Sequence, residues 1–112
     1  MKDRELRDYI NDLLEACEDI LSFTKDMSYS DFASDRKTVN AVTRSLEVIG
    51  EAAKKLPMSF RNNYPNVPWR QMAGMRDKLI HEYFGIDKQM VWQAVEKHIP
   101  DILALIKEIT ID

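Results

Sequence analysis

The sequence contains few of the residues that build turns or covalent cross-links. Its 112 residues include 3 glycines, 4 prolines and 1 cysteine. So little turn-forming material favours a few long helices over many short strands. The lone Cys17 excludes an internal disulfide and a cysteine zinc cluster. No apolar run approaches the roughly 20 residues of a membrane span, and the charged N-terminal segment lacks the apolar stretch of a signal peptide. We therefore expect a cytoplasmic protein that has no membrane contact.

The residues that are present are typical of one folded domain. Hydrophobic residues make up 45% of the chain and charged residues 31%, which argues against disorder. A chain of this length can bury one modest hydrophobic core. We expect a single domain over residues 1–112.

Apolar residues that recur at steps of three and four predict four main helices. The helices are expected over residues 3–27, from the end of the turn at 28–35 to Leu56, over 69–83, and from a cap at Asp87 to the C-terminus. The proline-rich connector between Pro57 and Trp69 has room for one short helical turn. The predicted fold is an all-α antiparallel bundle of four main helices plus that extra turn.

Three residues inside these helices carry specific expectations. Gly50 lies mid-helix, where a glycine lets another helix approach closely. Pro100 should kink or briefly break the last helix, because it removes a backbone hydrogen bond. Cys17 falls within the apolar stripe of the first helix, so we interpret it as a core residue and not as a nucleophile.

Charge is distributed unevenly along the chain, although the net charge is only −3. Residues 54–88 carry 7 basic and 3 acidic side chains, a balance of +4, whereas residues 1–53 carry 7 basic and 12 acidic ones. A locally positive surface can hold a polyanion even on an acidic protein. Chance clustering in a short window explains the count equally well.

The positive segment contains a cluster of groups that could carry chemistry, Arg76, Asp77 and His81. On a continuous helix Asp77 and His81 share a face, so the carboxylate can fix the imidazole tautomer. Arg76 and His81 would lie about 140° apart around that helix and would not stack directly. A two-fold dimer would compensate by bringing two copies of the cluster together.

A histidine with a nearby arginine suits cleavage of RNA without a metal or cofactor. The ribose 2′-hydroxyl attacks phosphorus, the imidazole moves a proton, and the guanidinium stabilises the charge that develops on the phosphate. A structural or solvated histidine is the competing interpretation, because this spacing is weak as a bare pattern. No metal site is expected, since the chain has no histidine pair at i,i+4 and no H-E-x-x-H. Tyr83 can be an exposed phenol open to modification or a half-buried amphipathic tyrosine.

Three separated motifs give the chain a family resemblance. The segments "SLEVIGEAAKKL", "PWRQMAGM" and "RDKLIHEYFGID" resemble the HepT-type toxins of the HEPN superfamily. The similarity extends from the first helix to "VWQAVEKHIPDIL", in the same order, and the R-x-x-x-x-H-x-Y motif shows no departure.

The resemblance implies a homodimeric all-α HEPN fold and a metal-independent endoribonuclease that acts as the toxin of a type VII-like toxin–antitoxin pair. Arg76, Asp77 and His81 map to its catalytic residues. Its partner would be an MNT-type nucleotidyltransferase antitoxin that neutralises the toxin by attaching AMP to Tyr83. The expected substrate is RNA, with tRNA as the favoured class, and Arg70 and Lys78 in the positive segment are the expected RNA contacts.

Two other functions stay open from the sequence. The domain could be a non-catalytic helical partner of a minimal nucleotidyltransferase, or bind nucleotide itself. It could also be a helical dimer with a purely structural role.

Overall fold

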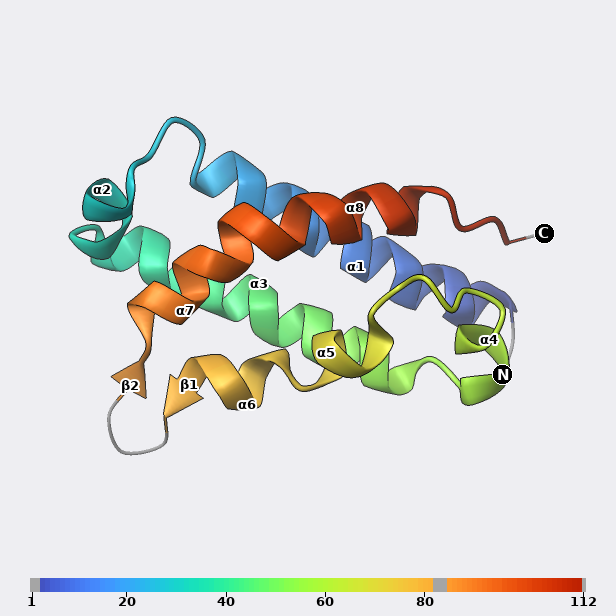
Figure 1. Cartoon of the computed structure of the whole chain (residues 1–112). Coiled ribbons are helices and arrows are strands. Elements are labelled where there is room, and N and C mark those ends of the chain that lie inside the picture. Colours follow the sequence, from blue (N-terminus) through green and yellow to red (C-terminus); the bar gives the residue numbers. More distant parts are fainter. Residues whose placement is uncertain (1–2, 82–84, 112) are drawn as a thin grey trace.

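The computed structural model describes residues 3–81 and 85–111 and shows four long helical segments that alternate in direction (Figure 1). The segments are α1, α3, the broken helix α5–α6 and the continuous run α7–η1–α8. The elements in chain order are α1 (Asp3–Phe23), α2 (Tyr29–Ala33), α3 (Arg36–Lys55), α4 (Met58–Arg61), α5 (Trp69–Ala73), α6 (Met75–Leu79), β1 (Ile80–His81), β2 (Gly85–Ile86), α7 (Lys88–Gln93), the π-helix η1 (Ala94–His98) and α8 (Ile99–Lys107). The predicted all-α bundle is confirmed, and α4 is the extra turn expected in the connector.

Side-chain caps fix the starts of three helices. Ser28 and Asp31 form a reciprocal capping box that starts α2, a helix that the sequence analysis treated as a turn. Asp35 accepts a hydrogen bond of 3.2 Å from the Thr38 backbone N–H at the start of α3, and this bond lowers the pKa of Asp35 below its ordinary value. Asp87 accepts from the Met90 N–H at 3.1 Å, which confirms the predicted cap of the last helical segment.

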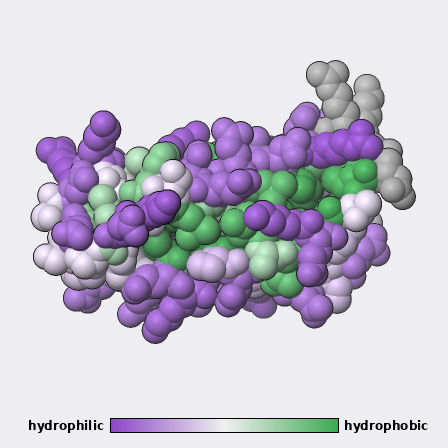
Figure 2. Space-filling model, turned by 90° about the horizontal axis from the view of Figure 1, so that it is seen from above, coloured by the Kyte–Doolittle hydropathy of each residue, from purple (hydrophilic) through white to green (hydrophobic). Residues whose placement is uncertain are grey.

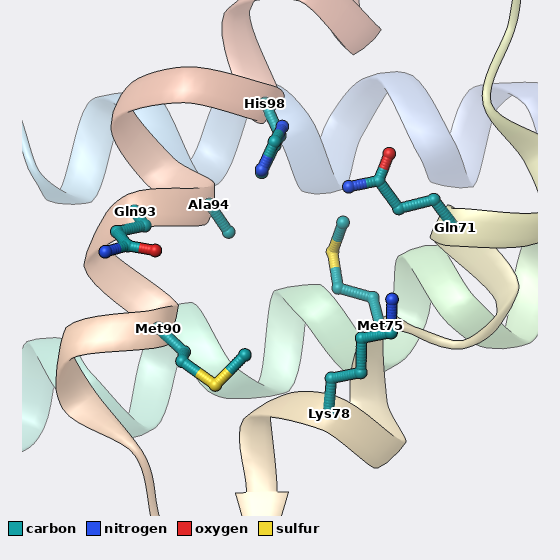
Figure 3. Close-up of a pocket in the computed structure, with 7 residues that line it drawn as sticks. All are labelled: Gln71, Met75, Lys78, Met90, Gln93, Ala94 and His98. Atoms are coloured by element: carbon teal, nitrogen blue, oxygen red, sulfur yellow. The ribbon is translucent and has the colours of Figure 1, made fainter.

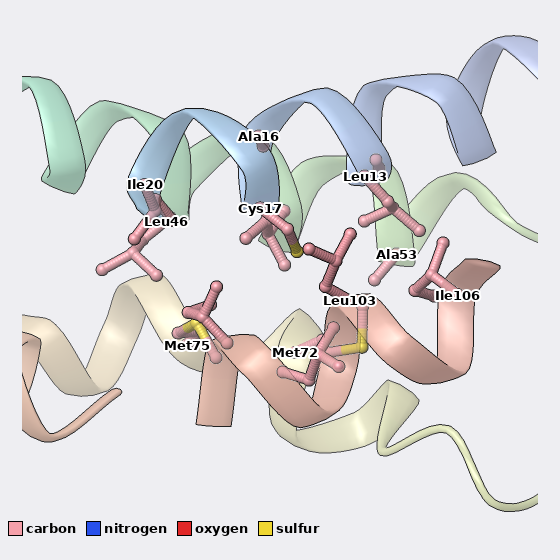
Figure 4. Close-up of a cluster of buried hydrophobic side chains, with 14 of the residues drawn as sticks. Leu13, Ala16, Cys17, Ile20, Leu46, Ala53, Met72, Met75, Leu103 and Ile106 are labelled. Atoms are coloured by element: carbon pink, nitrogen blue, oxygen red, sulfur yellow. The ribbon is translucent and has the colours of Figure 1, made fainter. Parts of the chain in front are cut away.

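All four helical segments contribute to the hydrophobic core (Figure 4). Side chains from α1, such as Leu13 and Ile20, meet Leu46 of α3, Met72 of α5 and Ile106 of α8. Cys17 is completely buried among them, and burial raises the pKa of its thiol to about 12. The prediction that Cys17 is a core residue is therefore confirmed.

Gly50 marks the closest approach of α5 to α3. A Cβ atom at this position would lie 3.4 Å from the carbonyl oxygen of Met72 and 3.5 Å from that of Ala73. A side chain longer than a methyl group would therefore meet the backbone of α5. The expectation that Gly50 permits a close helix contact is confirmed.

The third predicted helix is shorter than expected and is interrupted. Gly74 separates α5 from α6, as its low helix propensity allows. Helix α6 then ends at Leu79, and Ile80 and His81 pair with Ile86 and Gly85 as a two-residue antiparallel hairpin. Gly85 has φ of +78°, a conformation that glycine adopts without steric cost. The prediction of one helix from Trp69 to Tyr83 was therefore wrong at Ile80 and His81, and its last two residues lie outside the described part of the chain.

Pro100 lies near the start of α8, directly after the π-helix η1. In an unaltered α-helix its ring would clash with the carbonyl group four residues earlier, that of Glu96. The wider turn of η1 precedes that point, with the Ile99 N–H bonded to the carbonyl of Ala94. The predicted disturbance is present, but as a widened turn and not as a break.

The face seen in Figure 2 carries a stripe of apolar side chains between hydrophilic ones. Helices α1 and α8 are the uppermost elements on that side in Figure 1. Half-buried apolar residues of these two helices include Leu14, Leu21 and Leu105. Within residues 3–81 and 85–111, no helix combines the length and the apolar character needed to cross a membrane.

Candidate functional site

Arg76 projects from α6 and pairs with α3. Its Nε lies 3.6 Å from Oε2 of Glu47, and 55% of the Arg76 side chain remains exposed. Glu47 also lies 3.7 Å from Arg44, which in turn lies 3.8 Å from Glu51. These four residues form a charge cluster that joins α3 to α6 and fixes the guanidinium at the surface.

The helical geometry assumed for Asp77 and His81 was wrong. It required both residues on one helix, but α6 ends at Leu79 and His81 lies in β1. The predicted separation of 140° between Arg76 and His81 also required one continuous helix, so it does not apply. Asp77 is exposed on α6, and the position of His81 is defined by the pairing of its backbone with Gly85. His81, five residues after Arg76 in the chain, therefore lies just beyond the end of the helix that carries the arginine.

The structure does not describe the side chains of two predicted site residues. Tyr83, the expected modification site, lies outside the described residues. The side chain of His81 also lies outside them, so its role remains a prediction.

The two predicted RNA contacts line one surface hollow. Arg70 of α5 and Lys78 of α6 are both exposed, and both border an open depression of about 960 Å³. Trp69 and Gln71 also line this hollow. The break at Gly74 therefore does not separate the two cations, because they face the same depression from successive short helices.

The other histidine, His98, was not among the predicted site residues. It belongs to η1 and lines a smaller pocket together with Lys78 and Gln71. Twenty residues separate His98 from Lys78 in the chain, and no local spacing connects them. Only the packing of the last helical segment against α5 and α6 brings them together.

The part of the chain that the structure describes contains no group of three His, Cys, Asp or Glu side chains placed to hold a metal ion. The same part presents Arg70, Arg76 and Lys78 as exposed cations on α5 and α6. Guanidinium and ammonium groups bind phosphate oxygens by charge-assisted hydrogen bonds. The fold and the site define a helical-bundle domain whose third helical segment carries three exposed cations.

Comparison with known proteins specifies this class further. The family model described as "Ribonuclease HepT-like" matches residues 13–109. A "Putative RNase" of Methanocaldococcus jannaschii is 49% identical over 112 residues, which is 100% of this chain and 93% of the relative. A "Probable ribonuclease HepT" of Thermococcus cleftensis is 48% identical over 99 residues, covering 88% of this chain and 90% of the relative. A "Putative RNase" of Caldanaerobacter subterraneus is 46% identical over 103 residues, or 92% of each chain.

No solved structure gives a significant match. The chain belongs to the HepT-like ribonuclease family, which confirms the resemblance seen in the motifs and the prediction of a ribonuclease.

Proposed function

We propose that the protein is a toxin of a toxin–antitoxin pair and cleaves RNA, with tRNA as the favoured substrate, by a metal-independent reaction at Arg76 and His81. The observation that carries the proposal is the order of groups along one short stretch. Exposed Arg76 and Lys78 on α6 lead directly into the strand that holds His81. Arg70 shares a hollow with Lys78 and extends the cationic surface along α5.

The proposed reaction transfers a phosphodiester within the RNA chain. The ribose 2′-oxygen attacks the adjacent phosphorus as His81 takes up its proton, and the bond from phosphorus to the 5′-oxygen breaks. The leaving 5′-oxygen takes a proton from the protonated imidazole of His81, and the products are a 2′,3′-cyclic phosphate and a 5′-hydroxyl end. Arg76 stabilises the added negative charge on the phosphate oxygens, and Asp77 contributes as the adjacent polar residue.

The test measures cleavage of tRNA in the presence of EDTA by three variants, His81→Ala, Arg76→Ala and Arg44→Ala. We expect His81→Ala to abolish cleavage while helical content and thermal unfolding stay unchanged. Arg44 is a matched control for Arg76, because both arginines pair with Glu47 but only Arg76 lies on α6. Arg76→Ala should lose cleavage and Arg44→Ala should retain it. Full activity of His81→Ala would refute the proposed mechanism.

We also propose that an MNT-type nucleotidyltransferase is the antitoxin and that it attaches AMP to Tyr83, two residues after His81. The added anionic group would compete with RNA phosphate for the same cations. Such a system would operate in the cytoplasm, where RNA and ATP are available. Intact mass measured after incubation with the antitoxin and ATP should rise by one AMP for each chain, and Tyr83→Phe should prevent the rise.

The alternative function is a non-catalytic partner of the nucleotidyltransferase, which the net charge of −3 favours. The same cleavage assay separates the two functions. Lack of cleavage by an unmodified wild-type preparation would favour the partner.

We further propose a homodimer that buries the apolar stripe of Figure 2. The apolar stripe supports the dimer. The angular separation of Arg76 and His81, from which a dimer was first expected, no longer does, because the two residues do not share one helix.

A further inference from the structure

A second hollow borders the proposed RNA-binding surface. It lies between α5–α6 and the α7–η1 segment and has a volume of about 200 Å³. Gln71 and Lys78 line both this pocket and the larger hollow, so the two depressions adjoin. An RNA strand whose phosphates lie along Arg70 and Lys78 would pass the mouth of the smaller pocket.

Polar groups from two helical segments converge on this pocket (Figure 3). The imidazole of His98 and the amide of Gln71 face each other across the pocket, and the thioether of Met75 lies below them in this view. Gln93 of α7 also lines the pocket, at its edge beyond Ala94. The buried residues Met75 and Ala94 supply the apolar surface. The pocket thus combines an apolar contact area with groups that both donate and accept hydrogen bonds.

Volume and chemistry together limit the ligand. An apolar cavity of about 150 Å³ holds one benzene ring, whereas sites for drug-sized ligands begin at about 300 Å³. A pocket of about 200 Å³ therefore suits one planar ring system. A side-chain amide can both donate to and accept from the edge of a base, as in the recognition of nucleic acids. A sulfur atom and an imidazole ring make favourable contacts with an aromatic face.

We propose that this pocket is a recognition subsite for one unpaired base of the RNA substrate. Gln71 and Gln93 read the edge of the base, His98 and Met75 contact its ring, and Lys78 holds the adjoining phosphate. The inference rests on the proposed function and deepens it, because it assigns the choice of nucleotide to groups outside the Arg76–His81 motif.

Binding to RNA that cannot be cleaved tests the subsite separately from the chemistry. Short 2′-O-methyl oligonucleotides of A, C, G or U lack the attacking hydroxyl, and an abasic oligonucleotide keeps the same phosphates. Wild-type protein should bind at least one of the four sequences about tenfold more tightly than the abasic strand. Gln71→Ala and Gln93→Ala should reduce that ratio to about twofold or less, with unchanged thermal unfolding.

Gln89 is the matched control for Gln93. It lies exposed on α7 one turn earlier and does not line the pocket. Gln89→Ala should keep the wild-type ratio. Equal ratios for the wild type and both pocket variants would overturn the proposal. Saturable binding of free nucleoside monophosphates, without base preference in the oligonucleotides, would also overturn it.

The outcomes also separate this inference from the proposed ribonuclease. A base preference that depends on Gln71 in a protein that does not cleave RNA would support the subsite and refute the reaction proposed at Arg76 and His81. RNA cleavage with a sequence preference that does not depend on Gln71 or Gln93 would support the reaction at Arg76 and His81 and refute the subsite.

Discussion

The guanidinium of Arg76 is expected to make two contacts at the same time. Its Nε pairs with Glu47 at 3.6 Å, while the proposed reaction needs the group to face an RNA phosphate. The contact through Nε is compatible with phosphate binding, because a guanidinium offers five N–H donors in a fixed plane. Glu47 is only 25% exposed and belongs to the long helix α3, so its carboxylate has a defined position. We infer that Glu47 is a positioning residue for Arg76.

This role predicts that Glu47→Gln lowers kcat for RNA cleavage by about tenfold to a hundredfold, because a misplaced group loses its transition-state contact. KM should change much less. Folding stability should fall by no more than about 1 kcal/mol, since exposed ion pairs contribute little. Steady-state cleavage kinetics and urea unfolding measure the two effects.

Glu51→Gln is the control for Glu47→Gln. Glu51 belongs to the same charge cluster but pairs with Arg44. Its variant should keep the wild-type kcat. A matching loss in both variants would show that general surface charge, and not the position of Arg76, governs the rate.

The contact between α3 and α5 controls how the cationic surface is built. Helix α5 carries Arg70 and borders the larger hollow, and its carbonyl groups lie against Gly50. Gly50→Leu should therefore force α5 outward and destabilise the fold by about 1–3 kcal/mol, as overpacking does. Urea unfolding measures this loss.

Gly50→Ala separates sterics from helix propensity at the same position. Its Cβ would make ordinary contacts of 3.4 Å and 3.5 Å with α5. Alanine also gains up to about 1 kcal/mol of helix propensity over glycine. We expect neutral or increased stability. A destabilisation equal to that of Gly50→Leu would show that the backbone approach tolerates no side chain.

The long helices were predictable from the sequence, whereas of the short elements only the turn α4 was expected. Apolar periodicity over twenty residues identified α1 and α3, since a stripe of that length has one structural solution. A five-residue helix such as α2 is too short for a periodic signal. The hairpin at Ile80 was missed because its two-residue strands have no alternation to detect.

For the site, too, local features of the sequence were predictable, and arrangements that depend on packing were not. Arg70 and Lys78 were predicted as RNA contacts because they lie in the positive segment, and the structure places both at one exposed hollow, while their role stays a prediction. The geometry assumed for His81 was wrong because it extrapolated a helix past its end at Leu79. His98 was missed because its proximity to Lys78 depends on packing between distant segments.

At the scale of the whole molecule, the open question is whether one chain holds a complete site. A second copy can complete the site only where it meets α6 and β1, because the apolar stripe in Figure 2 lies over α1 and α8, on the side away from these elements in Figure 1. Each chain has only two histidines, and His98 lines a different pocket from the surface that carries Arg76. A two-fold dimer can combine groups from both copies, because each contact in such an interface occurs twice.

If the site is shared, two inactive variants should complement each other. A mixture of Arg76→Ala and His81→Ala chains, unfolded and refolded together, should recover about one quarter of the wild-type cleavage rate. This value follows because about half of the dimers are mixed and each has one intact site of two. Each variant refolded alone should stay inactive, and light scattering should give a dimer mass for all three samples. Dimers without recovered cleavage would place the complete site within one chain, and a monomer mass for the wild type would refute the dimer itself.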